Sequence, residues 1–165
     1  MDIVVEAEGW LIGPDGRLRC ALGRGGVRQD KREGDGATPL GCFPLRTVLY
    51  RPDRIPMPQT ALPLRAIVGS DGWCDDPADP AYNRAVTLPY PARHERLWRE
   101  DGLYDLIVIL GYNDAPPVAG AGSAIFLHVA RPGLLPTEGC VALPLAELAT
   151  LVAQCRPGDR LCVQS

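Results

Sequence analysis

The sequence lacks the features of several common protein classes. It has only two histidines and no CxxC pair, and its 17 lysines and arginines are outnumbered by 20 aspartates and glutamates, for a net charge of −3. Nucleic-acid binding needs a basic surface and a zinc hydrolase needs ligands at metal spacing, so we predict neither. A membrane-spanning helix needs about 20 consecutive apolar residues, and no stretch of this sequence approaches that length.

Other signatures are missing as well. The glycine-rich residues 23–36 contain neither GxxxxGKS/T nor GxGxxG, so they predict a solvated surface loop rather than a phosphate-binding loop. The acidic run at residues 71–77 lacks the spacing of a calcium loop, and no metal site is predicted. The first ten residues place Asp2 and Glu6 where a signal peptide has a basic region and a long apolar segment. We therefore expect a soluble protein whose export route stays open.

The composition fits a single domain over residues 1–165. Hydrophobic residues make up 46% and charged residues 22%, as in ordinary soluble domains. The 18 glycines and 17 prolines indicate many turns between short strands. Six cysteines are scattered along the chain, at positions 20, 42, 74, 140, 155 and 162. This scatter predicts small core residues plus one special case, not a disulfide framework.

The apolar runs predict a mainly β (α+β) fold with seven or more short strands and one or two helices. The turn signal Gly13-Pro14-Asp15-Gly16 predicts a hairpin of residues 2–12 and 17–22. The run YDLIVILGY at residues 104–112 predicts a strand buried on both faces at the centre of a sheet. Further strands are expected at residues 42–45, 47–50, 123–129 and 160–163, and an extended connector at 51–63.

Two segments predict helices. After Pro144, apolar residues follow the i, i+3, i+4, i+7 pattern to about residue 155, as in an amphipathic helix. Residues 91–100, PARHERLWRE, combine helix-forming residues with a proline suited to a first turn. A helix there places His94 on an exposed polar face, away from any catalytic role.

A histidine and a cysteine lie on neighbouring predicted elements. His128 ends the strand over residues 123–129, and Cys140 follows a loop rich in proline and glycine, just before a new apolar run. An imidazole beside a thiol can remove its proton and stabilise the thiolate, which is the reactive form. Both residues also fit plain core packing, because cysteine is among the most buried residue types.

Three residues in the irregular segment 71–88 are candidates for a substrate wall. Trp73, Tyr82 and Arg84 are side chains of the kind that line clefts when they lie on loops. Plain packing explains them equally well.

Two segments carry a family resemblance. The first is TPLGCFPL at residues 38–45, and the second is His128 followed by TEGCVA at residues 137–142. In composition, order and separation they resemble the L,D-transpeptidase catalytic domain, the YkuD-type cysteine enzymes of bacterial cell-wall metabolism. The resemblance spans roughly residues 1–165 and implies a mixed β-sandwich or barrel-like sheet with a packed helix.

The chain departs from the family pattern at three points. Glu138 stands where the family usually has histidine, and Ala142 where it commonly has arginine or asparagine. The interval of 12 positions between His128 and Cys140 is shorter than usual. These departures leave the nucleophile and base in place and indicate a divergent subgroup with altered substrate preference.

The resemblance implies the chemistry of the site. Cys140 is expected to attack a peptidoglycan stem peptide with His128 as base, and the N–H groups of Gly139 and Cys140 to stabilise the oxyanion. Arg131, Thr137 and Glu138 are candidate substrate contacts, Arg131 for a carboxylate. The expected partners are donor and acceptor stem peptides, the acceptor amine lying on diaminopimelate, and a carbapenem as a covalent adduct. No metal or organic cofactor is expected, and the location is periplasmic or at the cell wall.

Two alternatives stay open. Water in place of the amine makes the same site a peptidoglycan hydrolase, an L,D-carboxypeptidase or endopeptidase. A protein that keeps the fold without the chemistry is a non-catalytic wall-binding module.

Overall fold

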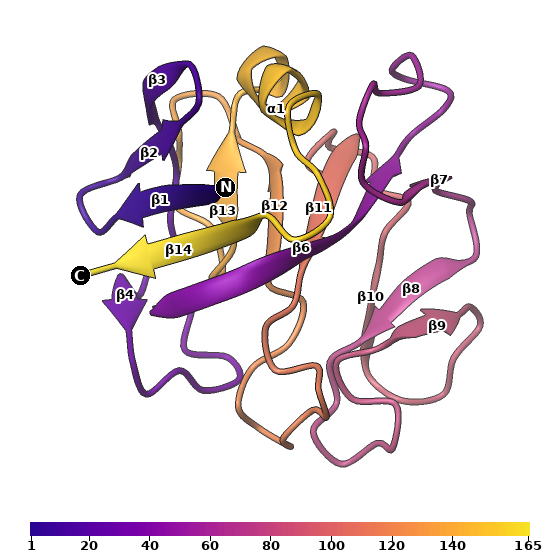
Figure 1. Cartoon of the computed structure of the whole chain (residues 1–165). Coiled ribbons are helices and arrows are strands. Elements are labelled where there is room, and N and C mark those ends of the chain that lie inside the picture. The colour runs from indigo at the N-terminus through magenta and orange to yellow at the C-terminus, as the bar shows by residue number, and fades with distance from the viewer.

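A nine-stranded sheet curves around the main core in the computed structural model, which describes all residues 1–165 (Figure 1). Eight strands follow one path, in the order β13 (Val141–Leu143), β12 (Phe126–Val129), β11 (Leu106–Leu110), β6 (Gly41–Tyr50), β14 (Arg160–Gln164), β1 (Asp2–Glu6), β2 (Trp10–Gly13) and β3 (Gly16–Arg19). The ninth, β7 (Leu64–Ala66), pairs with β6 in parallel.

The sheet comes close to closing on itself. Just after β3, Ala21 exchanges two backbone hydrogen bonds with Ala142 of β13, at 2.8 and 3.0 Å, so the two ends of the strand path meet. The expectation of a mainly β, barrel-like fold is therefore confirmed. The predicted hairpin is present, although residues 2–12 form two strands, β1 and β2, because Gly9 takes a turn with a φ of +88° between them.

Strand β6 joins the two halves of the sheet. It runs for ten residues through both segments that the sequence predicts as separate short strands. Its first half pairs with β14 and its second half with β11 and β7. Strand β11 lies between β6 and β12, with four of its five residues buried, in agreement with the predicted central strand.

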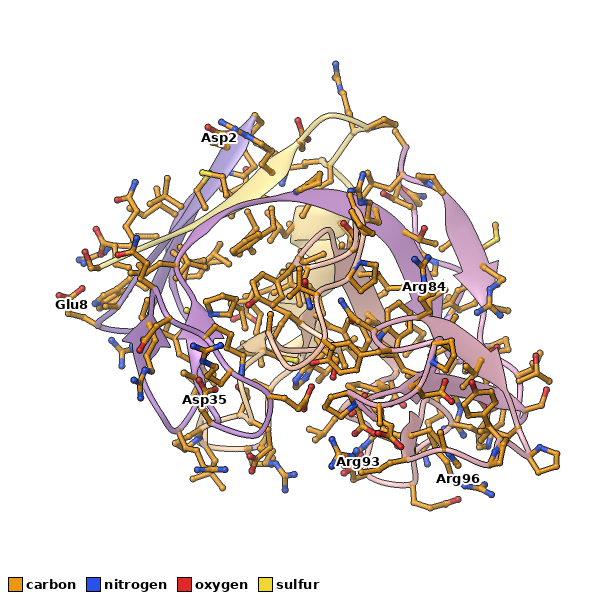
Figure 2. All side chains as sticks on the ribbon, turned by 90° about the horizontal axis from the view of Figure 1, so that it is seen from below. Asp2, Glu8, Asp35, Arg84, Arg93 and Arg96 are labelled. Atoms are coloured by element: carbon orange, nitrogen blue, oxygen red, sulfur yellow. A yellow bond between two sulfur atoms is a disulfide. The ribbon has the colours of Figure 1, made fainter.

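Two smaller sheets complete the strands. One holds β10 (His94–Arg96), β8 (Asp71–Cys74) and β9 (Ala85–Thr87) in that order, and the other pairs β4 (Val27–Arg28) with β5 (Thr38–Pro39). Figure 2 shows the region of Arg84, Arg93 and Arg96 across the molecule from Asp2 and Glu8. The helix predicted for residues 91–100 is wrong. Pairing with β8, which places Glu95 opposite Trp73, overrides the local helix preference.

The single helix, α1 (Leu145–Val152), begins after Pro144 as predicted and ends three residues before the expected limit of 155. It buries Leu148, Leu151 and Val152 in the main core, a cluster of 21 buried residues that lines the inside of the curved sheet. No helix in the structure has the length and apolarity that a membrane crossing requires.

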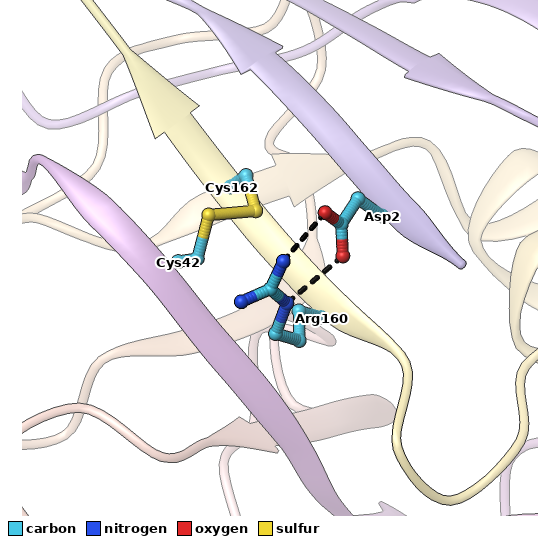
Figure 3. Close-up of a disulfide and its surroundings, with 4 residues drawn as sticks. All are labelled: Asp2, Cys42, Arg160 and Cys162. Carbon is cyan, nitrogen blue, oxygen red and sulfur yellow. Dashed lines mark hydrogen bonds and ion pairs between the residues drawn. A yellow bond between two sulfur atoms is a disulfide. The ribbon is translucent and has the colours of Figure 1, made fainter.

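The expectation that the cysteines are small core residues plus one special case is wrong for two of the six. Cys42 and Cys162 form a disulfide that joins β6 to β14, beside the ion pair of Asp2 and Arg160 (Figure 3). The partners are 120 positions apart, and they meet because the antiparallel pairing of β6 and β14 puts them directly opposite each other. The other four cysteines are free and buried.

Candidate active site

A cavity of about 620 Å³ holds both residues of the predicted reacting pair. His128 comes from β12, and Cys140 from the position just before β13, which pairs with β12 in parallel. The lining of the cavity comes from loops, together with one residue of β10 and one of β12: Lys31, Glu33, Gly34, Asp75, Glu95, Arg99, Leu103, Tyr104, Ser123, Ala124, Ile125, His128, Arg131, Leu135, Pro136, Thr137, Glu138 and Cys140.

The imidazole of His128 is held in one tautomer. Its Nδ1 lies 2.8 Å from the carbonyl oxygen of Val129, which can only accept, so Nδ1 carries the proton and Nε2 is free to accept one. The ring of Tyr104 packs edge-on against it, with centroids 5.4 Å apart. Burial lowers the pKa of His128 to about 4, so the ring is neutral near pH 7.

The thiol of Cys140 is buried in a second, smaller core cluster that includes Trp73, Tyr104 and Phe126. Its Sγ donates to the carbonyl of Ala124 at 3.2 Å and accepts from the N–H of Phe126 at 3.3 Å. Burial raises the pKa of Cys140 to about 12. The resting pair is therefore a neutral thiol and a neutral imidazole, not a thiolate and an imidazolium.

The loop before Cys140 is shaped by Thr137. Its Oγ1 donates to the Cys140 carbonyl at 2.6 Å and accepts from the N–H of Gly139 at 3.1 Å. The N–H of Cys140 makes no hydrogen bond within the protein. Of the two donors expected for an oxyanion, that of Cys140 is thus free, and that of Gly139 is engaged.

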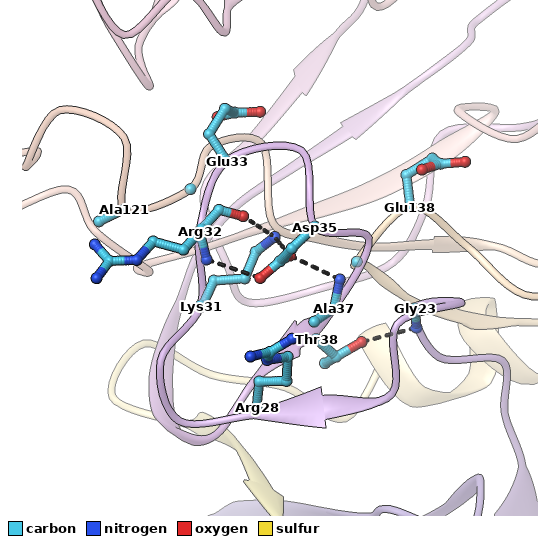
Figure 4. A network of polar contacts seen from close by, with 12 residues as sticks. Gly23, Arg28, Lys31, Arg32, Glu33, Asp35, Ala37, Thr38, Ala121 and Glu138 are labelled. Atoms are coloured by element: carbon cyan, nitrogen blue, oxygen red, sulfur yellow. Dashed lines mark hydrogen bonds and ion pairs between the residues drawn. The ribbon is translucent and has the colours of Figure 1, made fainter.

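Glycine is required at position 139. Its φ is +137°, and a Cβ there would lie 2.8 Å from the carbonyl oxygen of Ala37, closer than a side chain tolerates. Ala37 directly precedes Thr38, whose buried Oγ1 accepts from the N–H of Gly23 at 2.9 Å (Figure 4). The residue that precedes the first of the two family-like segments therefore packs against the second, beside Cys140.

The glycine-rich loop contributes to the site, although its sequence predicts only a solvated loop. Lys31 is buried and donates to Asp35 at 2.6 Å and to the Arg32 carbonyl at 3.0 Å (Figure 4). Asp35 also accepts from the backbone N–H groups of Arg32 and Ala37. This network presents Lys31 and Glu33 to the cavity.

The three candidate substrate contacts near the nucleophile all line the cavity. Arg131 is exposed and forms no ion pair, whereas Glu138 pairs with Arg24 at 2.9 Å and has 81% of its side chain exposed. The hydroxyl of Thr137 already forms hydrogen bonds within the loop. Arg131 is thus the one of the three with a free charged group.

The three residues predicted to form a substrate wall do not line this cavity. Trp73 and Tyr82 are buried behind the cavity, Trp73 edge-on to Phe126 at 5.1 Å and Tyr82 donating to Glu33 at 2.7 Å. Arg84 faces a separate pocket of about 290 Å³. His94 lies on β10, with Nδ1 bonded to the Ala92 carbonyl, and does not line the cavity.

Sequence reasoning missed Asn83, which organises the back of the site. Its buried amide accepts from Trp73 Nε1 and from the Ala124 N–H, both at 3.0 Å, and donates to the carbonyls of Tyr112 and Asn113. Ala124 is held at a φ of +53°, with its carbonyl on the Cys140 thiol. No local pattern indicates this role.

Glu95 and Tyr104 are also cavity residues that the sequence does not single out. The Tyr104 hydroxyl donates to Glu95 Oε1 at 2.6 Å. Glu95 escapes detection because the segment predicts a helix, in which its orientation differs from that on β10. No three His, Cys, Asp or Glu side chains gather in a way that could hold a metal ion.

Comparison with known proteins identifies the family and the fold. The YkuD family model, described as the L,D-transpeptidase catalytic domain, matches residues 8–163. A crystal structure of the helical cell shape determining protein Pgp2 from Campylobacter jejuni shares the fold, with a TM-score of 0.50 and 15% sequence identity over 99% of this chain. The chain spans about half of that structure, 47% of its length. No curated protein matches the chain in sequence.

Proposed function

Because the chain belongs to the L,D-transpeptidase catalytic domain family, we propose that it is a cysteine-dependent L,D-transpeptidase acting on peptidoglycan stem peptides. One observation carries the proposal. A single cavity contains a thiol, an imidazole whose Nε2 is free, and an unbonded backbone N–H on the residue that carries the thiol. These are the nucleophile, base and oxyanion donor that acyl transfer needs.

In the first half-reaction, Cys140 exchanges its bond to Ala124 for one to His128 Nε2, which takes the thiol proton. The sulfur attacks an amide carbonyl of the donor stem, and the Cys140 N–H stabilises the negative oxygen of the tetrahedral intermediate. When the C–N bond breaks, His128 returns its proton to the leaving amine. The product is a thioester on Cys140.

In the second half-reaction, an amine of another stem attacks the thioester and forms a crosslink. By family resemblance, the amine is expected on diaminopimelate. Arg131 suits a carboxylate of either stem, because its guanidinium is exposed and unpaired. Gly139 shapes the loop, while Glu138 and Thr137 stand beside the path of the substrate.

A periplasmic or cell-wall location is part of the proposal. The Cys42–Cys162 disulfide supports it, since disulfides persist in oxidising compartments and are rare in the cytosol.

The test is incubation with purified muropeptides, followed by tandem mass spectrometry of products and protein. We expect crosslinked dimers and a thioester adduct on Cys140, and a carbapenem adduct on the same residue. The Cys140→Ala variant should give neither adduct. Trimmed monomers without dimers would assign the site to a hydrolase, and sacculus binding without any product would assign it to a wall-binding module.

A further inference from the structure

Glu95 is a carboxylate on the cavity wall without a cationic partner. It lies on β10, which holds it opposite Trp73 in the pairing with β8. One oxygen accepts from the Tyr104 hydroxyl at 2.6 Å, and no lysine or arginine lies within ion-pair distance of either oxygen. The guanidinium of Arg99, which acts electrostatically on Glu95, pairs with Asp101 at 2.6 Å. The charged form of a half-buried carboxylate without a cationic partner is unfavourable, and either a bound proton or a cation that reaches it relieves this cost.

The position of Glu95 relates it directly to the reacting pair. Tyr104 links Glu95 to His128, because its hydroxyl donates to Glu95 and its ring packs against the imidazole of His128. The negative charge of Glu95 is also one of the influences that raise the pKa of Cys140. The carboxylate therefore lies within electrostatic reach of the sulfur, and it is the one residue of β10 that lines the cavity.

We propose that Glu95 binds the ammonium group of the incoming amine acceptor and accepts the proton that this group must lose before it attacks the thioester. This inference rests on the proposed function and assigns a catalytic residue to its second half-reaction. A carboxylate with one oxygen oriented by Tyr104 and the other free is suited to a charge-assisted hydrogen bond with an ammonium.

The balance of the step fixes what Glu95 must do. An ammonium and a thioester give an amide, a thiol and one proton. The nitrogen first loses a proton to Glu95, and its lone pair then attacks the carbonyl carbon. The C–S bond breaks, and the sulfur receives the second nitrogen proton through His128 Nε2. Glu95 afterwards releases its proton to solvent.

The surroundings of Glu95 agree with this role. Burial raises its pKa to about 7, so it can both accept and release a proton near neutrality. The charged groups that act on it are Arg99, which opposes the rise, and Asp75 and Glu33, which add to it. Tyr104 is the titratable group in direct contact.

The test compares Glu95→Gln with Asp75→Asn. Both variants remove a negative charge from the cavity lining, but Asp75 is already paired with Arg93 at 3.1 Å. Each acyl-enzyme is formed from a thioester donor, and the rates of acylation and of attack by glycinamide, a small primary amine, are measured separately. We expect Glu95→Gln to slow attack by glycinamide about tenfold or more without slowing acylation, and Asp75→Asn to slow neither step to that extent.

Several results would overturn the assignment. They are an unchanged aminolysis rate in Glu95→Gln, an equal loss in Asp75→Asn, and an equal slowing of attack by water, which carries no ammonium. If the wild type forms no acyl-enzyme, the proposed function fails by itself. In that case the ammonium site is tested by binding alone. Glycinamide is titrated into the Cys140→Ala variant and its binding is monitored by NMR, with N-acetylglycinamide as the neutral control ligand. Binding that Glu95→Gln abolishes supports it, and binding that persists overturns it.

Discussion

The thiol of Cys140 donates to the backbone carbonyl of Ala124, 3.2 Å away, and makes no hydrogen bond with His128. The proposed nucleophile is therefore held as a neutral thiol on a backbone acceptor. Its activation requires a rotation of the thiol toward His128 Nε2 followed by proton transfer. This contrasts with cysteine sites in which a neighbouring cation keeps a thiolate ready in the resting state.

Loss of the base should slow acylation across the neutral range. We expect His128→Ala to reduce the rate of carbapenem acylation about a hundredfold or more. Alkylation of Cys140 by iodoacetamide near neutral pH should slow as well, with peptide mapping to separate it from the other cysteines. Unchanged alkylation in this variant would contradict the role of His128 as activating base.

The pH dependence of acylation should show a low inflection. The pKa of His128 is lowered to about 4, so the ring is an available base above that pH and is lost as pH falls through it. Carbapenem acylation reports the first half-reaction alone, and its base-dependent limb should fall only near pH 4. An inflection near the ordinary histidine value of about 6.5 would show that the ring is better solvated than its burial implies.

Asn83 should be the most sensitive polar residue behind the site. Asn83→Gly keeps the left-handed backbone (φ +57°) and removes all four side-chain hydrogen bonds. We expect the free energy of unfolding in guanidinium to fall by about 3 kcal/mol, since buried groups lose their partners. Alkylation of Cys140 should become faster because Ala124 is no longer fixed.

Asn113→Gly is the matched control for Asn83→Gly. It also has a positive φ, +50°, and bonds to the backbone at Val118 and Gly122, but its loop is more exposed. Water can replace these bonds, and the loss should be about 1 kcal/mol. Equal losses in the two variants would argue against a special role for Asn83.

Two glycines of the active-site loop separate backbone strain from collision. Gly133→Ala meets no atom within 4 Å, so only its φ of +77° opposes the change, at a cost of about 1 kcal/mol in unfolding free energy. Gly139→Ala adds the overlap with the Ala37 carbonyl. We expect it to destabilise by more than about 2 kcal/mol and to slow acylation. Similar stabilities by thermal unfolding would mean that the loop moves aside freely.

The disulfide should stabilise the sheet without affecting chemistry. It closes a long loop between Cys42 and Cys162, so reduction should lower the free energy of unfolding by about 2–4 kcal/mol. Neither residue lines the cavity, and acylation by a carbapenem should be unchanged. Thiol titration of the denatured protein should find four free thiols before reduction. Six before reduction would contradict the pairing.

The parts of the fold that were predicted correctly depend on long local patterns. The run at residues 104–112 is apolar throughout, and β11 is indeed central. The pattern after Pro144 repeats at helical spacing, and α1 follows it. The segment 91–100 has no such periodicity, only favourable composition. Its conformation is decided by hydrogen bonds to β8, about 20 residues earlier.

The site residues that local sequence motifs define could be predicted. The site residues that tertiary contacts bring into place could not. His128 and Cys140 could be found from their neighbouring elements and from the motifs around them. The position of Glu95 depends on strand β10, the role of Asn83 on contacts with three other segments of the chain, and the disulfide on the pairing of β6 with β14. No pattern in the neighbouring residues indicates any of these three features.

The reacting pair and the wall facing it are encoded in separate stretches of the chain. His128 and Cys140 lie within residues 126–143, whereas Glu95 belongs to the β8–β10 sheet, which is attached to the main body by Asn83 and by the stacking of Arg51 on Trp98 at 3.6 Å. Under the proposed function, acceptor choice and bond-making chemistry can thus diverge independently. Exchanging residues 71–99 between relatives should transplant selectivity while the nucleophile stays in place.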